Sequence, residues 1–408
     1  MKSTNRSIAA VLGCLVLIGA GNLLAQDWPQ WRGPNRDGKV TGFTAPQKWP
    51  TALTQKWQTN VGLGDSTPAL VDDKLYVCTR QGSDEVTLCL NVADGKEVWK
   101  TKYAAQAVSG PASSHPGPRG SPAVADGKVV TLGVGGVVSC LDAATGKELW
   151  RKDEFPKVVP AFFAAMSPII ADGMAIAHVG GKESAAVIAF DLATGAQKWK
   201  WAGDGPAYAS PVLMTVEGSK QLVEQTEKNL VGLAVADGKL LWQVPTPIQG
   251  RANSCATPMV NGQTVIFTGQ GRGTRAVKIE KQGDAFAAKE LWVNEKLGTG
   301  FNTPVLKDGF LYGLSDGGNF YCMNAKDGQS VWTDTAKRDR FCAIVDTGSV
   351  LMALPEKSGL IAFKPSDKQY EQLAQIKVSD TPIYAHPVVA GNRIFVKDRE
   401  TVTMWTID

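Results

Sequence analysis

The chain of 408 residues is 43% apolar and 20% charged, with a formal net charge of +4 at pH 7. This composition is typical of a globular protein with a large core and excludes a disordered chain. So small a net charge produces no bulk attraction to nucleic acid, which we exclude as a partner.

The first 25 residues are organised like a secretory signal peptide. A short basic region contains Lys2 and Arg6, and an apolar run extends from Ile8 to Gly21. Small residues lead up to Ala25, after which we expect cleavage. No other segment has the roughly 18 apolar residues that a membrane span requires. The mature protein is therefore expected to be periplasmic or secreted, with lipid anchoring through Cys14 as the alternative.

Residues 26–50 are rich in tryptophan and proline and have the periodicity of neither a strand nor a helix. Their aromatic content predicts an ordered extension that is held in place by the packing of its tryptophans. The repeats begin after this extension, and we expect residues 51–408 to form one domain.

The rest of the chain contains a series of similar openings in which Ser or Thr precedes Pro. Six openings follow this rule, at Thr67, Ser121, Ser167, Ser210, Thr257 and Thr303. Cys342-Ala343 and His386-Pro387 are degenerate seventh and eighth openings. Successive openings lie 39 to 54 residues apart, which is close to the period of propeller blades. The predicted fold is an all-β propeller with eight blades of four antiparallel strands.

A second repeated element is the turn unit LDAATGKELW, at Leu141–Trp150, which recurs four times in similar form. Its Asp can accept turn N–H groups, its Gly supplies a positive φ, and its Trp is expected to wedge between neighbouring sheets. The glycines of the five units are Gly95, Gly146, Gly195, Gly238 and Gly328. The tryptophans at the equivalent place are Trp57, Trp99, Trp150, Trp199, Trp242, Trp292 and Trp332. In the seventh blade we expect Leu373 to replace this tryptophan.

The two ends of the repeat region complement each other. The segment from His386 to Asp408 supplies three strands, whereas Leu53–Asn60 is an outer, tryptophan-bearing strand with no inner strands before it. Pairing of these ends completes the eighth blade and closes the ring, which removes the exposed edges of an open array.

With turn units of the form AxDxxTGKxxW and strands like SPxxxDGxVY, the sequence from Leu53 to Asp408 resembles the eight-bladed pyrroloquinoline quinone (PQQ) repeat family. The resemblance is specific for the fold. It implies less about activity, because the family includes quinoprotein dehydrogenases and also non-catalytic propellers such as the outer-membrane assembly factor BamB. One fold can support several functions.

The loops between blades and the middle turns within blades are expected to gather on one face, around the central channel. Basic residues on these loops predict an electropositive funnel that binds an anionic ligand or an acidic peptide strand. The candidate residues are Arg80, His115, Arg119, Arg251, Arg272, Arg275, Arg340, His386 and Arg399. The alternative is a solvated rim of charges, partly neutralised by carboxylates on the same face.

Metal and cofactor chemistry has little support in the sequence. His178 lies within an expected strand and is interpreted as a packed residue, and no two histidines have the spacing of metal ligands. The sequence has no CxxCH and no adjacent pair of cysteines, which the resemblance would lead us to expect in a quinoprotein dehydrogenase. We therefore predict no catalytic residues, no metal site and no cofactor, with PQQ and calcium as the alternative.

Six cysteines remain after the expected cleavage, and most are interpreted as small packed residues. Cys78 and Cys89 flank a hairpin, so a cross-strand disulfide between them is an alternative in an oxidising compartment.

We interpret the chain as an exported, non-catalytic propeller that mediates protein–protein interaction in the cell envelope, in the manner of an outer-membrane assembly factor. We expect a monomer that acts within a larger complex. The competing hypotheses are a PQQ-dependent dehydrogenase and a protein that binds carbohydrate or a small anion.

Overall fold

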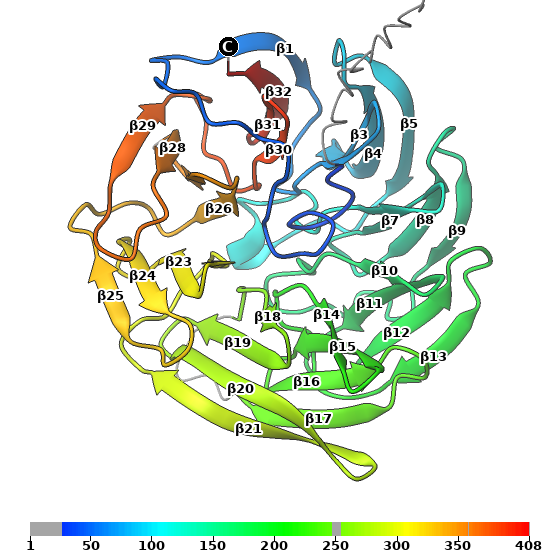
Figure 1. Ribbon diagram of the computed structural model, residues 1–408. Coiled ribbons are helices and arrows are strands. Elements are labelled where there is room, and N and C mark those ends of the chain that lie inside the picture. The colour runs from blue at the N-terminus through cyan, green and yellow to red at the C-terminus, as the bar shows by residue number, and fades with distance from the viewer. Residues whose placement is uncertain (1–26, 247–253, 358, 408) are drawn as a thin grey trace, which may run out of the picture.

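Eight four-stranded sheets are arranged like blades around a central channel in the computed structural model (Figure 1). The structure describes residues 27–246, 254–357 and 359–407, so the expected signal peptide and Cys14 lie outside the described residues. Within these ranges the helical content is one 3-10 turn, η1 (Gly110–Ala112), and no helix is long and apolar enough to cross a bilayer. The prediction of an all-β, eight-bladed propeller is confirmed.

Each blade is an antiparallel meander whose first strand lies nearest the channel and whose last strand lies at the rim (Figure 1). Blade 1 contains β2 (Ala69–Val71), β3 (Lys74–Gln81), β4 (Asp84–Asn91) and β5 (Glu97–Ala104). Blade 2 contains β6 (Ala123–Ala125), β7 (Lys128–Leu132), β8 (Val138–Asp142) and β9 (Glu148–Lys152). Blade 3 contains β10 (Ile169–Ala171), β11 (Met174–Gly180), β12 (Ala185–Asp191) and β13 (Gln197–Trp201). Blade 4 contains β14 (Val212–Val216), β15 (Ser219–Gln225), β16 (Asn229–Ala234) and β17 (Leu240–Pro245).

The second half of the ring repeats this arrangement. Blade 5 contains β18 (Met259–Asn261), β19 (Thr264–Gly269), β20 (Gly273–Gln282) and β21 (Ala285–Asn294). Blade 6 contains β22 (Val305–Lys307), β23 (Phe310–Leu314), β24 (Phe320–Asn324) and β25 (Ser330–Thr333). Blade 7 contains β26 (Cys342–Asp346), β27 (Leu351–Pro355), β28 (Leu360–Phe363) and β29 (Gln372–Ile376). Blade 8 contains β30 (Val388–Ala390), β31 (Arg393–Lys397), β32 (Thr401–Thr406) and, as its outer strand, β1 (Thr54–Asn60).

The two ends of the chain close the ring in blade 8, as predicted. β1 pairs antiparallel with β32, with Thr54 opposite Thr406 and Asn60 opposite Thr401. Trp57 lies opposite Met404 in this ladder, so the first strand of the chain brings its own tryptophan to the last blade. Pairing with β1 covers the edge of β32 and gives blade 8 the same four strands as the other blades.

The repeated tryptophans join each blade to the next one. Trp150, at 7% exposure, lies between blades 2 and 3, and its indole N–H donates to the carbonyl oxygen of Leu192 over 3.1 Å. Five others donate in the same way, at 2.8 to 3.1 Å, and they are Trp57, Trp99, Trp199, Trp292 and Trp332. A buried indole thus contributes its apolar area and also satisfies its one polar group.

The glycine of each turn unit makes room for the tryptophan of the preceding blade. Gly146 has φ of +72°, and a Cβ at this position would lie 2.4 Å from Cε3 of Trp99. The same relation holds for Gly95, Gly195, Gly238 and Gly328. The turn requires a residue with positive φ, and the tryptophan ring requires a residue without a side chain beneath it. Glycine meets both requirements.

Two blades depart from this pattern. Blade 5 has the long β20–β21 hairpin in place of a turn unit, and the indole of Trp242 donates instead to Oε1 of Gln221 in its own blade, at 2.7 Å. In blade 7 the register places Ala374 opposite Ala362, as Trp150 lies opposite Cys140 in blade 2. The expectation of Leu373 at the tryptophan position is therefore wrong by one residue.

The hydroxyl groups of the blade openings form hydrogen bonds around the channel. The backbone N–H of Ser121 donates to Oγ of Ser167, and that of Ser167 donates to Oγ of Ser210, both at 2.9 Å. At the closure, the N–H of His386 donates to Oγ1 of Thr67 at 2.8 Å. The opening needs Ser or Thr because the hydroxyl satisfies a buried N–H of the neighbouring blade.

The cysteines of the described residues are all free thiols. In the β3–β4 ladder Cys78 lies opposite Thr87 and Cys89 lies opposite Tyr76, so the two sulfur atoms are not cross-strand partners. The alternative of a Cys78–Cys89 disulfide is therefore wrong. Burial raises the pKa of both thiols to about 12, which makes them unreactive packed residues.

Candidate functional site

Residues 27–40 of the N-terminal extension enter the central channel, and we call this segment the belt (Figure 1). Trp28 exchanges two backbone hydrogen bonds with Leu70 of blade 1, at 2.8 and 2.9 Å. The carbonyl oxygen of Pro29 accepts from the N–H of Val124 in blade 2 at 2.8 Å. The belt leaves the channel at Val40, whose N–H donates to a carbonyl oxygen of blade 7 over 2.8 Å.

Two buried arginines fix the belt to the blades on the other side of the channel. Arg36 donates to three carbonyl oxygens of blades 3 and 4, those of Ser167, Pro168 and Pro211. Arg32 donates to the carbonyl oxygens of Thr303 and Pro304 in blade 6, at 3.1 and 2.9 Å. Burial lowers the pKa of Arg32 to about 10 and that of Arg36 to about 9. Both guanidinium groups therefore stay charged at neutral pH.

Trp31 at the tip of the belt forms the floor of a cavity on the opposite face. Its indole N–H donates to Oγ1 of Thr257 in blade 5 at 2.9 Å, and its ring packs edge-on against His386 of blade 8, with centroids 4.5 Å apart. A small chamber of about 90 Å³ lies here, lined in part by His386. The Nδ1 atom of His386 has no hydrogen-bond partner. Burial and the charge of Arg32 lower the pKa of His386 well below its usual value, so the ring is neutral.

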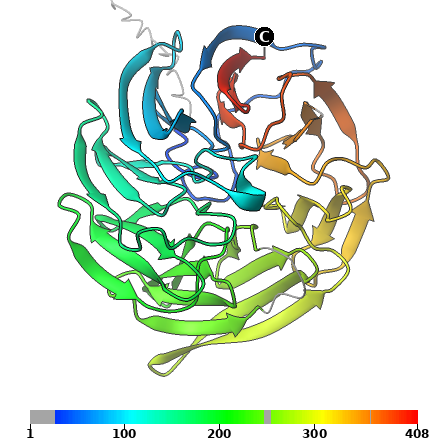
Figure 2. The same ribbon diagram turned by 180° about the vertical axis from the view of Figure 1, so that it is seen from behind.

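Above this floor lies a wider cavity of about 400 Å³, which we call the funnel and which is lined in part by Pro111 and Ala112 of η1. Figure 2 shows the face of the propeller that carries η1. The wall of the funnel has one residue from the approach to each blade, two positions before the opening in seven blades and one position before it in blade 7. These eight residues are Asp65, Arg119, Ala165, Tyr208, Cys255, Phe301, Phe341 and Tyr384. The ring closure of the propeller therefore gathers residues that are far apart in the sequence.

Aromatic side chains form a connected wall on one side of the funnel. The rings of Phe301 and Phe341 stack with centroids 4.6 Å apart, and Phe341 meets Tyr384 edge-on at 4.9 Å. Tyr384 in turn meets His115 edge-on at 4.8 Å. On the opposite side the ring of Phe162, which is 38% exposed, packs edge-on against the ring of Tyr208, with centroids 6.0 Å apart. The funnel is thus lined mainly by aromatic faces and edges rather than by charges.

Polar partners hold these rings in place. Nδ1 of His115 lies 2.7 Å from Oδ2 of Asp65, and the hydroxyl of Tyr384 donates to Oε1 of Glu356 at 2.9 Å. Burial, reinforced by Glu356, raises the pKa of Tyr384. The carboxylates of the funnel are therefore already engaged with its own side chains.

Three of the predicted arginines lie at the funnel and carry no ion pair with a carboxylate of the described residues. Arg119 lines the cavity and donates to the carbonyl oxygens of Phe162 and His115 at 2.8 and 2.7 Å. Arg399 donates to the carbonyl oxygen of Ser114, and Arg340 lies over the ring of Phe301 at 5.0 Å. Burial lowers the pKa of Arg119.

The other predicted residues lie elsewhere. Arg80 is 7% exposed and donates to backbone carbonyl oxygens, including that of Gln106 at 3.0 Å. Its guanidinium group is therefore engaged within the protein. Arg272 and Arg275 line a separate cavity of about 600 Å³ beside blade 5. Arg275 is also paired with Glu290 at 3.4 Å. Arg251 lies outside the described residues.

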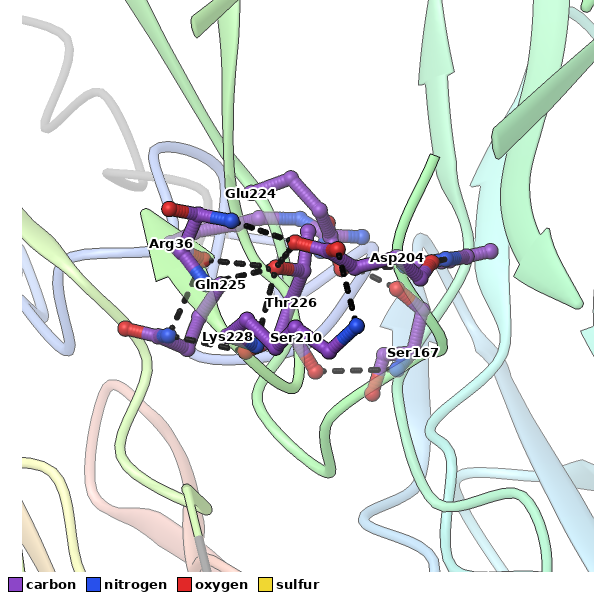
Figure 3. Close-up of polar contacts among 10 residues, drawn as sticks. Arg36, Ser167, Asp204, Ser210, Glu224, Gln225, Thr226 and Lys228 are labelled. Carbon is purple, nitrogen blue, oxygen red and sulfur yellow. Dashed lines mark hydrogen bonds and ion pairs between the residues drawn. The ribbon is translucent and has the colours of Figure 1, made fainter. Parts of the chain in front are cut away.

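The middle turn of blade 4 is fixed by a polar network on the funnel face (Figure 3). Oδ2 of Asp204 accepts from the hydroxyl of Thr226 at 2.9 Å and from the amide of Asn229 at 2.6 Å. Beneath it, Nδ1 of the buried His178 lies 3.3 Å from Oε1 of Glu224, whose pKa is raised by burial. His178 is buried in the core, as expected. This network supports the fold.

The described residues do not form a site for PQQ held together with a metal ion. No group of three His, Cys, Asp or Glu side chains comes together in the described ranges as a metal site would require. Of the two carboxylates described above, Asp65 is bonded to His115 and Glu356 to Tyr384. The channel below the funnel is filled by the belt, with Trp31 as its floor. We therefore derive no reaction step through PQQ.

Sequence reasoning found the basic residues of the funnel but missed its aromatic wall. Tyr208, Phe301 and Tyr384 were not singled out, although each lies two residues before an opening, and neither was Phe341, which lies one residue before the seventh opening. Alignment of the openings would have revealed this position, since it lines the funnel in seven of the eight blades. The belt arginines gave no such signal, because their partners are backbone carbonyls.

One protein family matches more than half of the chain. A model of the family described as outer membrane protein assembly factor BamB matches residues 84–334. BamB of Burkholderia pseudomallei is 26% identical over 368 residues, which cover 85% of this chain and 88% of the relative.

Two solved structures share the fold. The structure of BamB from Moraxella catarrhalis has a TM-score of 0.66 at 16% identity, covering 87% of this chain and all of the other. That of quinohemoprotein alcohol dehydrogenase from Comamonas testosteroni has a TM-score of 0.71 at 15% identity, covering 93% and 80%. Identities this low indicate a common architecture and carry no information about activity.

Proposed function

The chain belongs to the family of the outer membrane protein assembly factor BamB, and we propose that it is an exported propeller scaffold that binds protein partners in the cell envelope during assembly of outer-membrane proteins. It acts without catalysis of its own. We place it in the periplasm, as a monomeric propeller within a larger complex.

The observation that carries this proposal is the composition of the funnel. An open cavity with connected aromatic rings and three arginines free of carboxylate partners has the residue types that dominate protein interfaces. Aromatic side chains and arginine supply large contact area together with directional polar contacts. The candidate residues at this face are His115, Arg119, Arg340, His386 and Arg399.

The rigidity of the wall also supports a binding role. The rings are held by hydrogen bonds to Asp65 and Glu356 and by edge-on contacts with each other. A preformed site loses little conformational entropy when a partner docks. By contrast, no group of three His, Cys, Asp or Glu side chains in the described ranges could hold a metal ion.

The proposal is tested by deletion of the gene in the native organism and measurement of the folded outer-membrane proteins in isolated envelopes. We expect their amount to fall and to be restored by a plasmid copy of the wild-type gene. An unchanged outer-membrane protein profile, together with dye reduction by the purified protein when PQQ, calcium and an alcohol are added, would contradict it.

A further inference from the structure

We propose that the funnel binds an acidic, extended segment of a partner protein by receiving one tyrosine or tryptophan side chain of that segment. This inference rests on the proposed function and adds the chemistry of the ligand. It follows from the size of the cavity, the arrangement of its rings, its unpaired charges and the polar floor.

The cavity has the dimensions of a side-chain pocket. Its volume of about 400 Å³ lies at the lower end of the range for ligand sites, which is roughly 300–1,000 Å³. A whole folded element would not enter it, whereas one aromatic side chain with its flanking backbone would. An inserted ring can meet Phe341 and Tyr384 on one side and Phe162 on the other, at the stacked or edge-on separations that aromatic pairs prefer.

The charges at the mouth favour acidic residues on either side of the inserted ring. Arg119, Arg340 and Arg399 each contact the cavity or a residue that lines it, and their recorded partners are carbonyl oxygens and one aromatic ring. The nearby carboxylates of Asp65 and Glu356 are engaged by His115 and Tyr384. The three guanidinium groups at the mouth can therefore pair with the carboxylates of an acidic segment, whereas they would repel a basic one.

The floor distinguishes a polar aromatic residue from phenylalanine. His386 is 4% exposed and lines the small chamber below the funnel together with polar side chains, among them Ser167 and Asn302. The two cavities share eight lining residues, among them Trp31 and Phe341. A hydroxyl or an indole N–H at the tip of the inserted ring can reach toward this chamber. A buried polar atom that gains a partner on binding favours the ligand that supplies it.

The experiment is a calorimetric titration of the purified protein with short acidic peptides, acetylated and amidated so that they carry no terminal charge. The first peptide has one central Tyr among Asp, Glu and Gly. In the others the Tyr is replaced by Phe or by Ser, or the acidic residues are replaced by Lys. We expect the Tyr peptide to bind, the Phe peptide to bind more weakly, and the Ser and Lys peptides to bind about tenfold more weakly or not at all.

Variants of the protein locate the site. Phe341→Ala and Arg340→Ala should each lower the affinity for the Tyr peptide by about tenfold. Higher salt should also lower the affinity of the wild-type protein, because part of the attraction is electrostatic. Lys281→Ala and Leu149→Ala, at exposed positions away from the funnel, serve as controls for charge and apolar area. Circular dichroism and thermal unfolding confirm that each variant is folded.

Equal binding of the Tyr and Ser peptides, or Tyr-peptide binding that Phe341→Ala leaves unchanged, would overturn the inference. Binding of an oligosaccharide in place of any peptide would also overturn it. If no peptide binds but deletion of the gene still lowers the amount of outer-membrane proteins, the inference fails and the proposed function stands. If the peptide binds in the funnel and deletion has no effect on the envelope, the proposed function fails instead.

Discussion

The rim and the funnel of this propeller are built by opposite rules. At the rim the same glycine and tryptophan recur from blade to blade, and Gly146 packs on Trp99 as Gly195 packs on Trp150. At the funnel the recurring position is filled by a different side chain in almost every blade, from Asp65 to Tyr384. Positions that hold the same residue type in successive blades stabilise the scaffold. Positions that recur in each blade with varying residue types are free to take part in binding.

The belt belongs to neither rule, since it contacts each of the eight blades. Trp28 pairs with blade 1, Trp31 bonds to blade 5, and Arg36 bonds to blades 3 and 4. It closes the channel on one face and supplies the floor of the funnel on the other. The belt thus couples the regular scaffold to the irregular binding face, and changes in the three regions should have separable effects.

The largest loss of stability is expected at the rim. Trp150→Ala removes a side chain that is 7% exposed between two blades and leaves the carbonyl oxygen of Leu192 without its indole donor. Large-to-small changes of this kind cost about 3–5 kcal/mol. Denaturant unfolding of the variant should show this loss, whereas Trp332→Ala, at a half-buried position, should cost less. A loss below about 1 kcal/mol for Trp150→Ala would mean that the wedge does not hold the blades together.

A smaller loss is expected in the belt. Arg36→Met removes the donor of three buried carbonyl oxygens and the positive neighbour of Glu224, and hydrogen bonds from a charged group contribute about 1.5–3 kcal/mol. We expect unfolding free energy to fall by about 3 kcal/mol. Arg36→Lys keeps the charge and loses the planar fork, so its loss should lie in between. If Met and Lys are equally tolerated, the belt is not fixed through this side chain.

The smallest effect concerns the floor of the funnel and depends on pH. His386 is neutral when folded and takes up a proton when unfolded below its usual pKa of about 6.5. Its contribution to stability is fully present above that pH and is lost as pH falls toward the folded-state pKa, by at most about 1.4 kcal/mol per pH unit. His386→Gln should therefore unfold with a flatter dependence on pH between about 6.5 and 5. Parallel curves for both proteins would show that His386 is protonated in the folded state.

The sequence predicted the repeated parts of the molecule well and the unrepeated parts poorly. The turn units, the openings and the closure by β1 follow from patterns within each repeat, and the structure confirms them. The Cys78–Cys89 pairing and the place of Leu373 depended on the register of single ladders, and the expected registers were wrong by two residues and by one. The belt arginines and the aromatic wall depend on contacts across the closed ring, which no local pattern contains.

The most direct test of the account is photocrosslinking in living cells from two positions of matched exposure. p-Benzoylphenylalanine is placed at Phe162 in the funnel, 38% exposed, or at Leu149 on the rim, 41% exposed. We predict crosslinks from position 162 to a protein of the outer-membrane assembly machinery and none to that protein from position 149. Crosslinks from the rim alone would contradict the account and would place partner binding on the blade edges.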